Sequence, residues 1–116
     1  MEILKEELEK GIILITITKN IEIYTAPRLK KVLDELFEEE KHLIIINMEH
    51  IDYLDSSGLA VFMREHARLQ KVGYNLNFIN INNRIYEVFQ YTSLHQYIKL
   101  FNSIEEARSA IIPKEE

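Results

Sequence analysis

The chain has 116 residues, of which 47% are hydrophobic, and it contains no cysteine. This length and composition predict a single globular domain, which we place at residues 1–112, with a polar tail at residues 113–116. The missing cysteines exclude disulfides, thiolate metal sites and cysteine catalysis, and the net charge of −5 disfavours nucleic-acid binding.

The sequence has no apolar run near the roughly 20 residues that a membrane helix requires. Its first residues are acidic and lack the apolar core of a signal peptide. We therefore expect a cytoplasmic protein that does not insert into a membrane. No pattern in the sequence indicates a homodimer, so we expect a monomer when the protein is free.

The first half of the chain predicts a strand pair and a helix. Residues 3–8 and 12–17 predict two short strands, the second of them rich in β-branched residues, and Gly11 provides the backbone freedom of the turn between them. Residues 19–24 are predicted to form a loop, and Thr25 is placed to cap the helix that follows. That helix has one apolar face, formed by Leu29, Val32, Leu33, Leu36 and Phe37.

The middle of the chain predicts a buried strand and a long helix. Residues 43–48 are apolar until Asn47, which is typical of a strand covered on both faces. A helix is predicted from Gly58 to Lys71, and Gly73 is placed to end it. The residues expected to face the core are Leu59, Phe62, Met63, His66 and Leu69.

The last third predicts two more strands, at residues 76–81 and 97–101, each followed by a helix. Asn82 or Asn83 can cap the first of these helices. Ser103 and Glu106 have the spacing of a capping box at the start of the second.

The predicted order of elements is therefore ββαβαβαβα. The opening pair predicts an antiparallel hairpin, and the helices between the later strands predict parallel crossovers. The expected fold class is α/β, with a small mixed β-sheet of about five strands and four helices packed mainly on one face.

Residues 54–59, Leu-Asp-Ser-Ser-Gly-Leu, lie at the junction between the central strand and the long helix. A helix start exposes unpaired backbone N–H groups and the positive end of the helix dipole, so it favours an anion. Asp and Ser are also the ordinary N-cap residues. The residues alone leave three uses open: a cap, a nucleophile, or a serine that is switched by phosphorylation.

Self-catalysis is disfavoured by what surrounds this stretch in the sequence. A serine nucleophile needs a base that is oriented by a third group, and the histidines at positions 42, 50, 66 and 95 indicate none. The stretch is not a Gly-x-Ser-x-Gly elbow, and three widely spaced glycines provide no nucleotide-binding loop. No set of His, Asp and Glu has the spacing of a metal site. We therefore expect no enzyme activity, no cofactor and no metal.

With this order of elements, residues 55–61, Asp-Ser-Ser-Gly-Leu-Ala-Val, resemble the STAS domain of bacterial anti-sigma factor antagonists. The similarity covers nearly the whole chain. Residues 21–26, Ile-Glu-Ile-Tyr-Thr-Ala, stand in place of that family's loop before the first helix. The resemblance implies a partner-switching protein in transcription regulation, whose unphosphorylated form binds an anti-sigma factor serine kinase and thereby frees a sigma factor.

The resemblance also implies which residues carry this switch. In that family the kinase phosphorylates the serine directly after the aspartate, which weakens binding, and a serine phosphatase restores it. Carried over, the phosphoacceptor is Ser56. The surface expected to bind the partner consists of Glu22, Ile23, Tyr24, Asp55, Ser56, Ser57, Gly58, Ala60 and Arg64.

Three positions depart from that family's pattern. Lys19 lies near a frequent glycine, Glu22 replaces a common aspartate, and Ala60 replaces a frequent second glycine. The first two affect the loop surface, and so the identity of the partner. The third adds one methyl group to a helix and slightly favours helix formation.

A phosphate on Ser56 would add about −1.5 to −2 charges, and at a first helical turn it could accept backbone N–H bonds. We therefore expect the fold to survive modification while a docked partner is repelled. The alternative is a non-phosphorylated STAS interaction subunit of a stress-signalling or lipid-transport assembly, in which Ser56 is only a cap.

Overall fold

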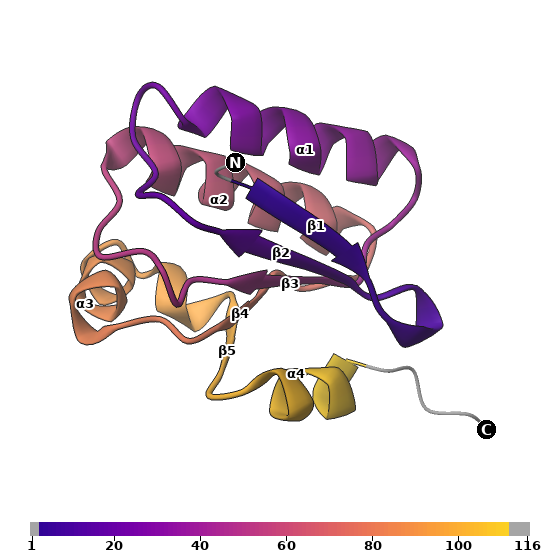
Figure 1. Ribbon diagram of the computed structural model, residues 1–116. Coiled ribbons are helices and arrows are strands. Elements are labelled where there is room, and N and C mark those ends of the chain that lie inside the picture. The colour runs from indigo at the N-terminus through magenta and orange to yellow at the C-terminus, as the bar shows by residue number, and fades with distance from the viewer. Residues whose placement is uncertain (1–2, 112–116) are drawn as a thin grey trace.

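The computed structural model describes residues 3–111 and shows the predicted order of elements (Figure 1). The predicted domain end at residue 112 and the tail at residues 113–116 lie outside the described residues. Short 3-10 turns occupy Glu9–Gly11 and Leu94–Gln96. The main elements are β1 (Ile3–Glu7), β2 (Ile13–Ile17), α1 (Ala26–Glu38), β3 (Ile44–Asn47), α2 (Ser56–Lys71), β4 (Asn77–Ile79), α3 (Asn83–Tyr91), β5 (Lys99–Phe101) and α4 (Ile104–Ile111).

The five strands form one sheet in the order β1-β2-β3-β4-β5. β1 and β2 form the expected antiparallel hairpin, with Ile3 opposite Ile17 and Glu7 opposite Ile13. The remaining neighbours are parallel, because a helix connects each strand to the next. The predicted mixed α/β sheet is therefore confirmed.

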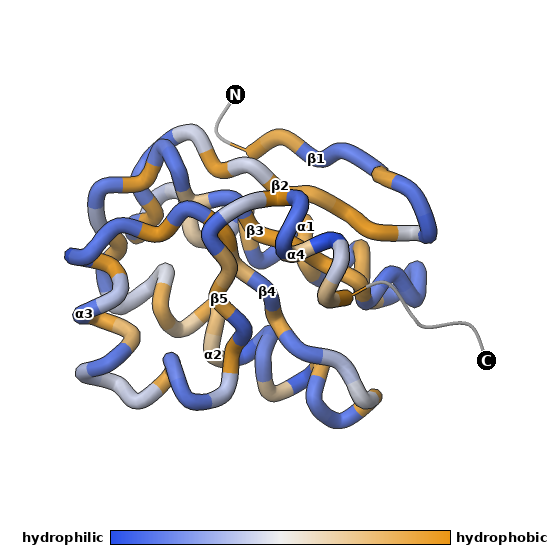
Figure 2. The backbone as a smooth tube through the Cα atoms, turned by 90° about the horizontal axis from the view of Figure 1, so that it is seen from below, coloured by the Kyte–Doolittle hydropathy of each residue, from blue (hydrophilic) through white to orange (hydrophobic). Residues whose placement is uncertain are grey.

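Three helices cover one face of the sheet, and α4 covers the other (Figure 1). On the first face, the buried rings of Phe62, Phe78 and Phe89 join α2, β4 and α3 through edge contacts of 4.9 and 5.3 Å between ring centroids. Figure 2 looks onto the α4 face, where apolar residues run along β2 and β3. The buried core there is small and consists of Ile12, Ile45, Ile79 and Ala107.

Helix α2 differs from the sequence prediction in its first residue and in which of its side chains are buried. It starts at Ser56 rather than Gly58, because Asp55 provides the N-cap. Met63 was predicted to face the core but is 46% exposed, whereas Glu65, at a position predicted to be exposed, is buried beside Arg68. Arg64 and Arg68 of α2 pair with Asp34 of α1, so charged side chains lie between the two helices.

Two predicted caps also differ from the structure. Thr25 makes no side-chain bond to α1; its hydroxyl accepts the Glu22 N–H at 2.9 Å and donates to the Asn20 carbonyl at 3.0 Å, which holds the preceding loop. Ser103 accepts the Glu106 N–H at 3.1 Å, which is one half of the predicted capping box.

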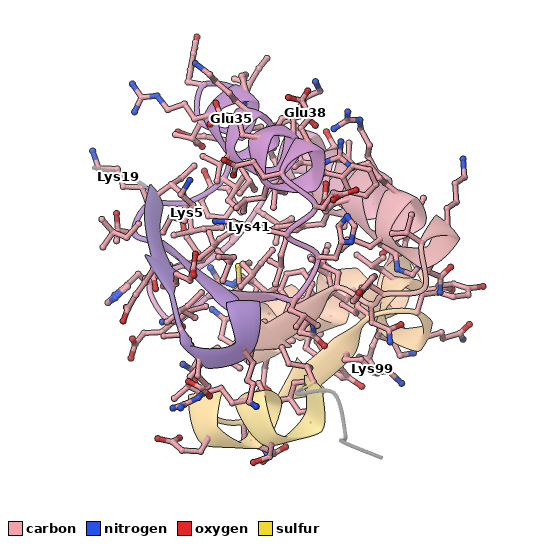
Figure 3. All side chains as sticks on the ribbon, turned by 90° about the vertical axis from the view of Figure 1, so that its right-hand side faces the viewer. Lys5, Lys19, Glu35, Glu38, Lys41 and Lys99 are labelled. Carbon is pink, nitrogen blue, oxygen red and sulfur yellow. The ribbon has the colours of Figure 1, made fainter. Side chains whose placement is uncertain are left out.

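Charge is spread over separate elements on the side shown in Figure 3. The labelled lysines include Lys5 on β1, Lys41 after α1 and Lys99 on β5, and Lys99 lies well away from the other two in this view. Among residues 3–111, no helix combines the length and apolar character needed to cross a membrane.

Candidate functional site

The Asp55–Gly58 junction positions an exposed hydroxyl at the first residue of α2. Asp55 has an extended backbone, and its Oδ1 accepts the N–H of Ser57 at 2.9 Å and that of Gly58 at 3.2 Å. The Ser57 hydroxyl also donates to this oxygen. Ser56 is exposed, and within residues 3–111 its hydroxyl takes part in none of these capping bonds. The two serines thus differ: the Ser57 hydroxyl supports the cap, whereas Ser56 is exposed to solvent and takes no part in the cap.

The capping bonds make Asp55 a fixed negative charge. The Ser57 hydroxyl, followed by the backbone N–H groups of Gly58, Ser57 and Ile23, holds the pKa of the Asp55 carboxyl below its usual range. This arrangement bears on the expectation that a phosphate on Ser56 could accept backbone N–H bonds. The N–H groups of Ser57 and Gly58 are already bonded to Asp55, so a phosphate on Ser56 would find these two donors occupied.

The loop before α1 lies directly against this junction. Ile21 pairs with Leu54 in a parallel bridge, and the Asp55 N–H donates to the Ile21 carbonyl at 3.1 Å. Asn20 Oδ1 accepts the N–H of Asp52 at 2.8 Å and of Tyr53 at 3.3 Å. The structure therefore joins the two loops into one unit at the carboxyl edge of the sheet.

Gly58 is required by the close approach of this loop. A Cβ atom added at Gly58 would lie 2.6 Å from Ile21 Cγ2 and 2.9 Å from Ile21 Cβ. Gly58 was expected on the partner-binding surface, and the structure instead places it in a tight junction between the two loops. Gly58 is buried and thus acts on the site through Ile21.

Glu22 and Tyr53 form an exposed link between the same two loops. The Tyr53 hydroxyl donates to Glu22 Oε2 at 3.0 Å, and this bond and the Glu22 charge raise the pKa of Tyr53. Sequence analysis missed the linking role of Asn20 and Tyr53. No local signal identifies it, because each bond joins residues more than 30 positions apart.

The loop also presents two large apolar side chains to solvent. Ile23 is 67% exposed and Tyr24 is 84% exposed. Exposed apolar residues next to an exposed hydroxyl are typical of a surface that a partner covers.

The structure separates the other two expected surface residues from the junction. Ala60 is exposed one turn along α2. Arg64 lies two turns along and pairs with Asp34 of α1 at 2.8 Å. Hydrogen bonds from Arg64 first, then from Lys30 and Arg68, lower the pKa of Asp34 to about 2. Arg64 thus contributes to the packing of α1 on α2.

The described residues contain no group of three or more His, Asp or Glu side chains placed to hold a metal ion. The histidines have contacts of other kinds. His42 packs between Phe37 and Tyr74, and His66 packs against Tyr97 at 5.6 Å between ring centroids. The arrangement at the junction is thus an exposed hydroxyl on an acidic and apolar surface.

Comparison with known proteins identifies similar chains. The family model described as "STAS domain" matches residues 5–107. The anti-sigma-B factor antagonist of Staphylococcus epidermidis is 31% identical over 74 residues, which cover 64% of this chain and 68% of the relative.

Solved structures share the fold at lower sequence identity. An anti-sigma factor antagonist from Mycobacterium paratuberculosis matches with a TM-score of 0.83 and 18% identity, over 94% of this chain and 92% of that one. The Bacillus cell fate determinant SpoIIAA in its phosphorylated form matches with a TM-score of 0.76 and 18% identity, over 94% and 98%.

Proposed function

The chain belongs to the STAS domain family, and we propose that it is an anti-sigma factor antagonist switched by phosphorylation of Ser56. In its unphosphorylated form it binds an anti-sigma factor that is also a serine kinase, and so frees a sigma factor. Phosphate on Ser56 releases the kinase, and a serine phosphatase resets the protein. The curated relatives with the name anti-sigma-B factor antagonist support this role.

One observation carries the proposal: the Ser56 hydroxyl is exposed at a helix start whose capping is done by its neighbours. Asp55 accepts the N–H groups of Ser57 and Gly58, so the helix does not depend on Ser56 for its cap. A residue that is exposed and structurally dispensable can be modified without unfolding the protein. Ser56 therefore suits a switch better than Ser57, whose hydroxyl bonds to Asp55.

The charges around Ser56 explain how the phosphate would act. It would bring about −1.5 to −2 charges next to the Asp55 carboxylate, and the donors of Ser57 and Gly58 are occupied. We therefore expect the phosphate to face solvent in the free protein and the partner in the complex. A partner that closes over the site must bury this anion beside a second one, which is costly without a new positive group.

The exposed side chains beside Ser56 supply the attraction in the unmodified state. Ile23 and Tyr24 offer apolar surface from one loop, and Ala60 offers a small residue from α2. The partner can cover this apolar surface only while the neighbouring Ser56 hydroxyl carries no phosphate, and it therefore binds the unmodified protein more tightly. The kinase activity belongs to the partner, since the chain lacks a nucleotide-binding glycine loop.

The test begins with each anti-sigma factor kinase encoded by the host, purified and titrated against the protein by calorimetry. One of them should bind the wild type, and Ser56→Asp should bind it at least about tenfold more weakly, with a thermal unfolding temperature close to that of the wild type. Incubation with this kinase and ATP should add one phosphate, measured by intact-mass spectrometry.

Ser57→Ala and Ser56→Ala form the matched pair for that measurement. The phosphate should be lost in Ser56→Ala and kept in Ser57→Ala. Equal affinity of wild type and Ser56→Asp, or a phosphate that maps to Ser57, would contradict the proposed switch. Protein isolated from its host without any phosphate, under conditions that activate the sigma factor and under those that do not, would favour an interaction subunit in which Ser56 is only part of a helix start.

A further inference from the structure

Helix α2 continues the Ser56 surface as a stripe of small and apolar residues. Ser56, Ala60, Met63 and Ala67 follow one another at spacings of four, three and four residues, which places them on one side of a helix. All four are exposed. The surface that carries the hydroxyl therefore extends along the helix without a charged side chain in this stripe.

The stripe leads into a groove of about 290 Å³ between α2 and the segment after α3. Met63 and Tyr97 form exposed parts of its lining, and Leu94 is buried. None of the lining residues is charged; they are Met63, His66, Ala67, Gln70, Thr92, Leu94 and Tyr97. In a chain with 28% charged residues, such a surface suits an uncharged occupant.

His66 is one of the residues that line this groove. The residue is 8% exposed, and its Nδ1 has no hydrogen-bond partner among the described residues. Burial lowers the pKa of His66 and so favours the uncharged ring. The ring packs 5.6 Å from that of Tyr97, measured between centroids. Together the two rings form an uncharged aromatic wall.

We propose that this groove receives an aliphatic or aromatic side chain of the same anti-sigma factor kinase that closes over Ser56. The inference rests on the proposed function and extends its interface. One observation favours this occupant: the exposed stripe of α2 runs from Ser56 through Ala60 to Met63 and Ala67, and the last two residues line the groove.

The groove and the hydroxyl divide the interface into two parts. Met63 lies seven residues beyond Ser56, which is about 10 Å along the helix. A phosphate on Ser56 therefore acts at one end of the interface and leaves the apolar anchor at the other end intact. Phosphorylation weakens binding by a finite factor, and the phosphorylated protein keeps a residual affinity that depends on the groove.

Met63→Glu tests the groove, with Val72→Glu as its matched control. Both residues are 46% exposed, both changes add one negative charge, and Val72 does not line the groove. Met63→Glu should weaken binding to the kinase identified above by at least about tenfold, while Val72→Glu stays within about twofold of wild type. Glu and Met have similar helix propensities, so the helix is retained.

The same change should act independently of Ser56. Combined with Ser56→Asp, Met63→Glu should lower affinity by the same factor as in the wild-type protein, because sites this far apart add. Ala67→Gln, which fills the groove without adding charge, should also weaken binding. It replaces Met63→Glu if circular dichroism shows that variant to be unfolded.

The outcomes separate this inference from the proposed function. If the wild type binds the kinase and Ser56→Asp weakens binding, but Met63→Glu and Ala67→Gln bind like the wild type, the groove is not part of the interface. Equal losses in Met63→Glu and Val72→Glu would assign the effect to net charge and overturn the inference. So would a wild-type dimer in sedimentation velocity that Met63→Glu dissociates, because a second copy would then occupy the groove. If no kinase binds the wild type, the proposed function fails first and the inference with it.

Discussion

Helices α2 and α3 begin in similar ways but use their first residues differently. Each helix follows a parallel strand of the sheet, and each has an Asp or Asn as its N-cap. Asp55 Oδ1 accepts the N–H groups of Ser57 and Gly58, and Asn82 Oδ1 accepts that of Ile85 at 2.8 Å. Both side chains therefore act as N-caps by accepting backbone N–H groups, two at Asp55 and one at Asn82.

The two caps differ in what else the side chain can do. The amide group of Asn82 donates to the carbonyls of Ile51 at 3.0 Å and Asp52 at 3.3 Å, and so holds the loop that leads to α2. The Asp55 carboxylate has no donor, and it places a negative charge beside the exposed Ser56 hydroxyl. Asn82 at the start of α3 thus holds the loop before α2, and we call its two bonds to Ile51 and Asp52 the brace. The start of α2, which this loop precedes, presents a charged surface.

The largest expected effect comes from closing the space at the start of α2. Gly58→Ala places a Cβ atom 2.6 Å from Ile21 Cγ2, so the loop before α1 must move or the helix must shift. Overpacking of this kind costs about 1–3 kcal/mol of unfolding free energy. Urea unfolding followed by circular dichroism measures the loss, and binding to the kinase should weaken as the loop is displaced.

Ala60→Gly is the control for that variant. It makes the reverse exchange at an exposed site in the same helix and should cost about 1 kcal/mol through helix propensity alone. Propensity favours alanine over glycine, so any loss in Gly58→Ala must come from the contact with Ile21. A Gly58→Ala protein that is as stable as the wild type would show that the two loops are not held as closely as their bonds indicate.

The next effect concerns the brace at the start of α3. Asn82→Ala removes both the cap and the two bonds to the loop, and should cost about 1–2 kcal/mol of unfolding free energy. Asn82→Ser keeps an acceptor for the Ile85 N–H but removes the amide donors. Asn82→Ser should lose less unfolding free energy than Asn82→Ala in the same urea titration. The loss that remains in Asn82→Ser is the contribution of the two bonds to the loop. If both variants lose equal stability, the cap at α3 contributes little and the brace carries the whole effect.

The comparison of the two helix starts also shows which structural features can be predicted from the sequence. The order of elements depends on local periodicity, and that prediction is confirmed. The helix start was predicted two residues too late, at Gly58, because Asp55 provides the N-cap and the helix begins at Ser56. The prediction for Met63 was wrong because the buried face of α2 includes Phe62 and Leu69 but ends before Met63, a limit that periodicity alone does not set. The role of Asn20 was missed for a similar reason, since its bonds reach residues more than 30 positions away. Helix caps and periodic apolar faces can be predicted from neighbouring residues. Contacts between loops cannot, because they form only when the folded sheet brings distant residues together.

The smallest expected effect separates charge from capping at the start of α2. Asp55→Asn keeps an acceptor for the N–H groups of Ser57 and Gly58 but removes the carboxylate. At pH 7 the wild type should unfold at a slightly higher temperature, because a negative charge interacts favourably with a helix N-terminus. Thermal unfolding of the two proteins between pH 7 and pH 3 measures the difference.

The direction of this pH dependence follows from the lowered pKa of Asp55. The carboxyl is ionised in both the folded and the unfolded protein above about pH 5, so its stabilising effect is fully present there. As the pH falls through the unfolded value near 3.9, the unfolded chain takes up the proton first, and the advantage over Asp55→Asn shrinks. Other carboxyls, including Asp34, titrate in both proteins and cancel in the comparison. A difference in unfolding temperature that stays constant down to pH 3 would mean that the Asp55 charge does not act on the helix, and that the negative surface at Ser56 must be assigned to another residue.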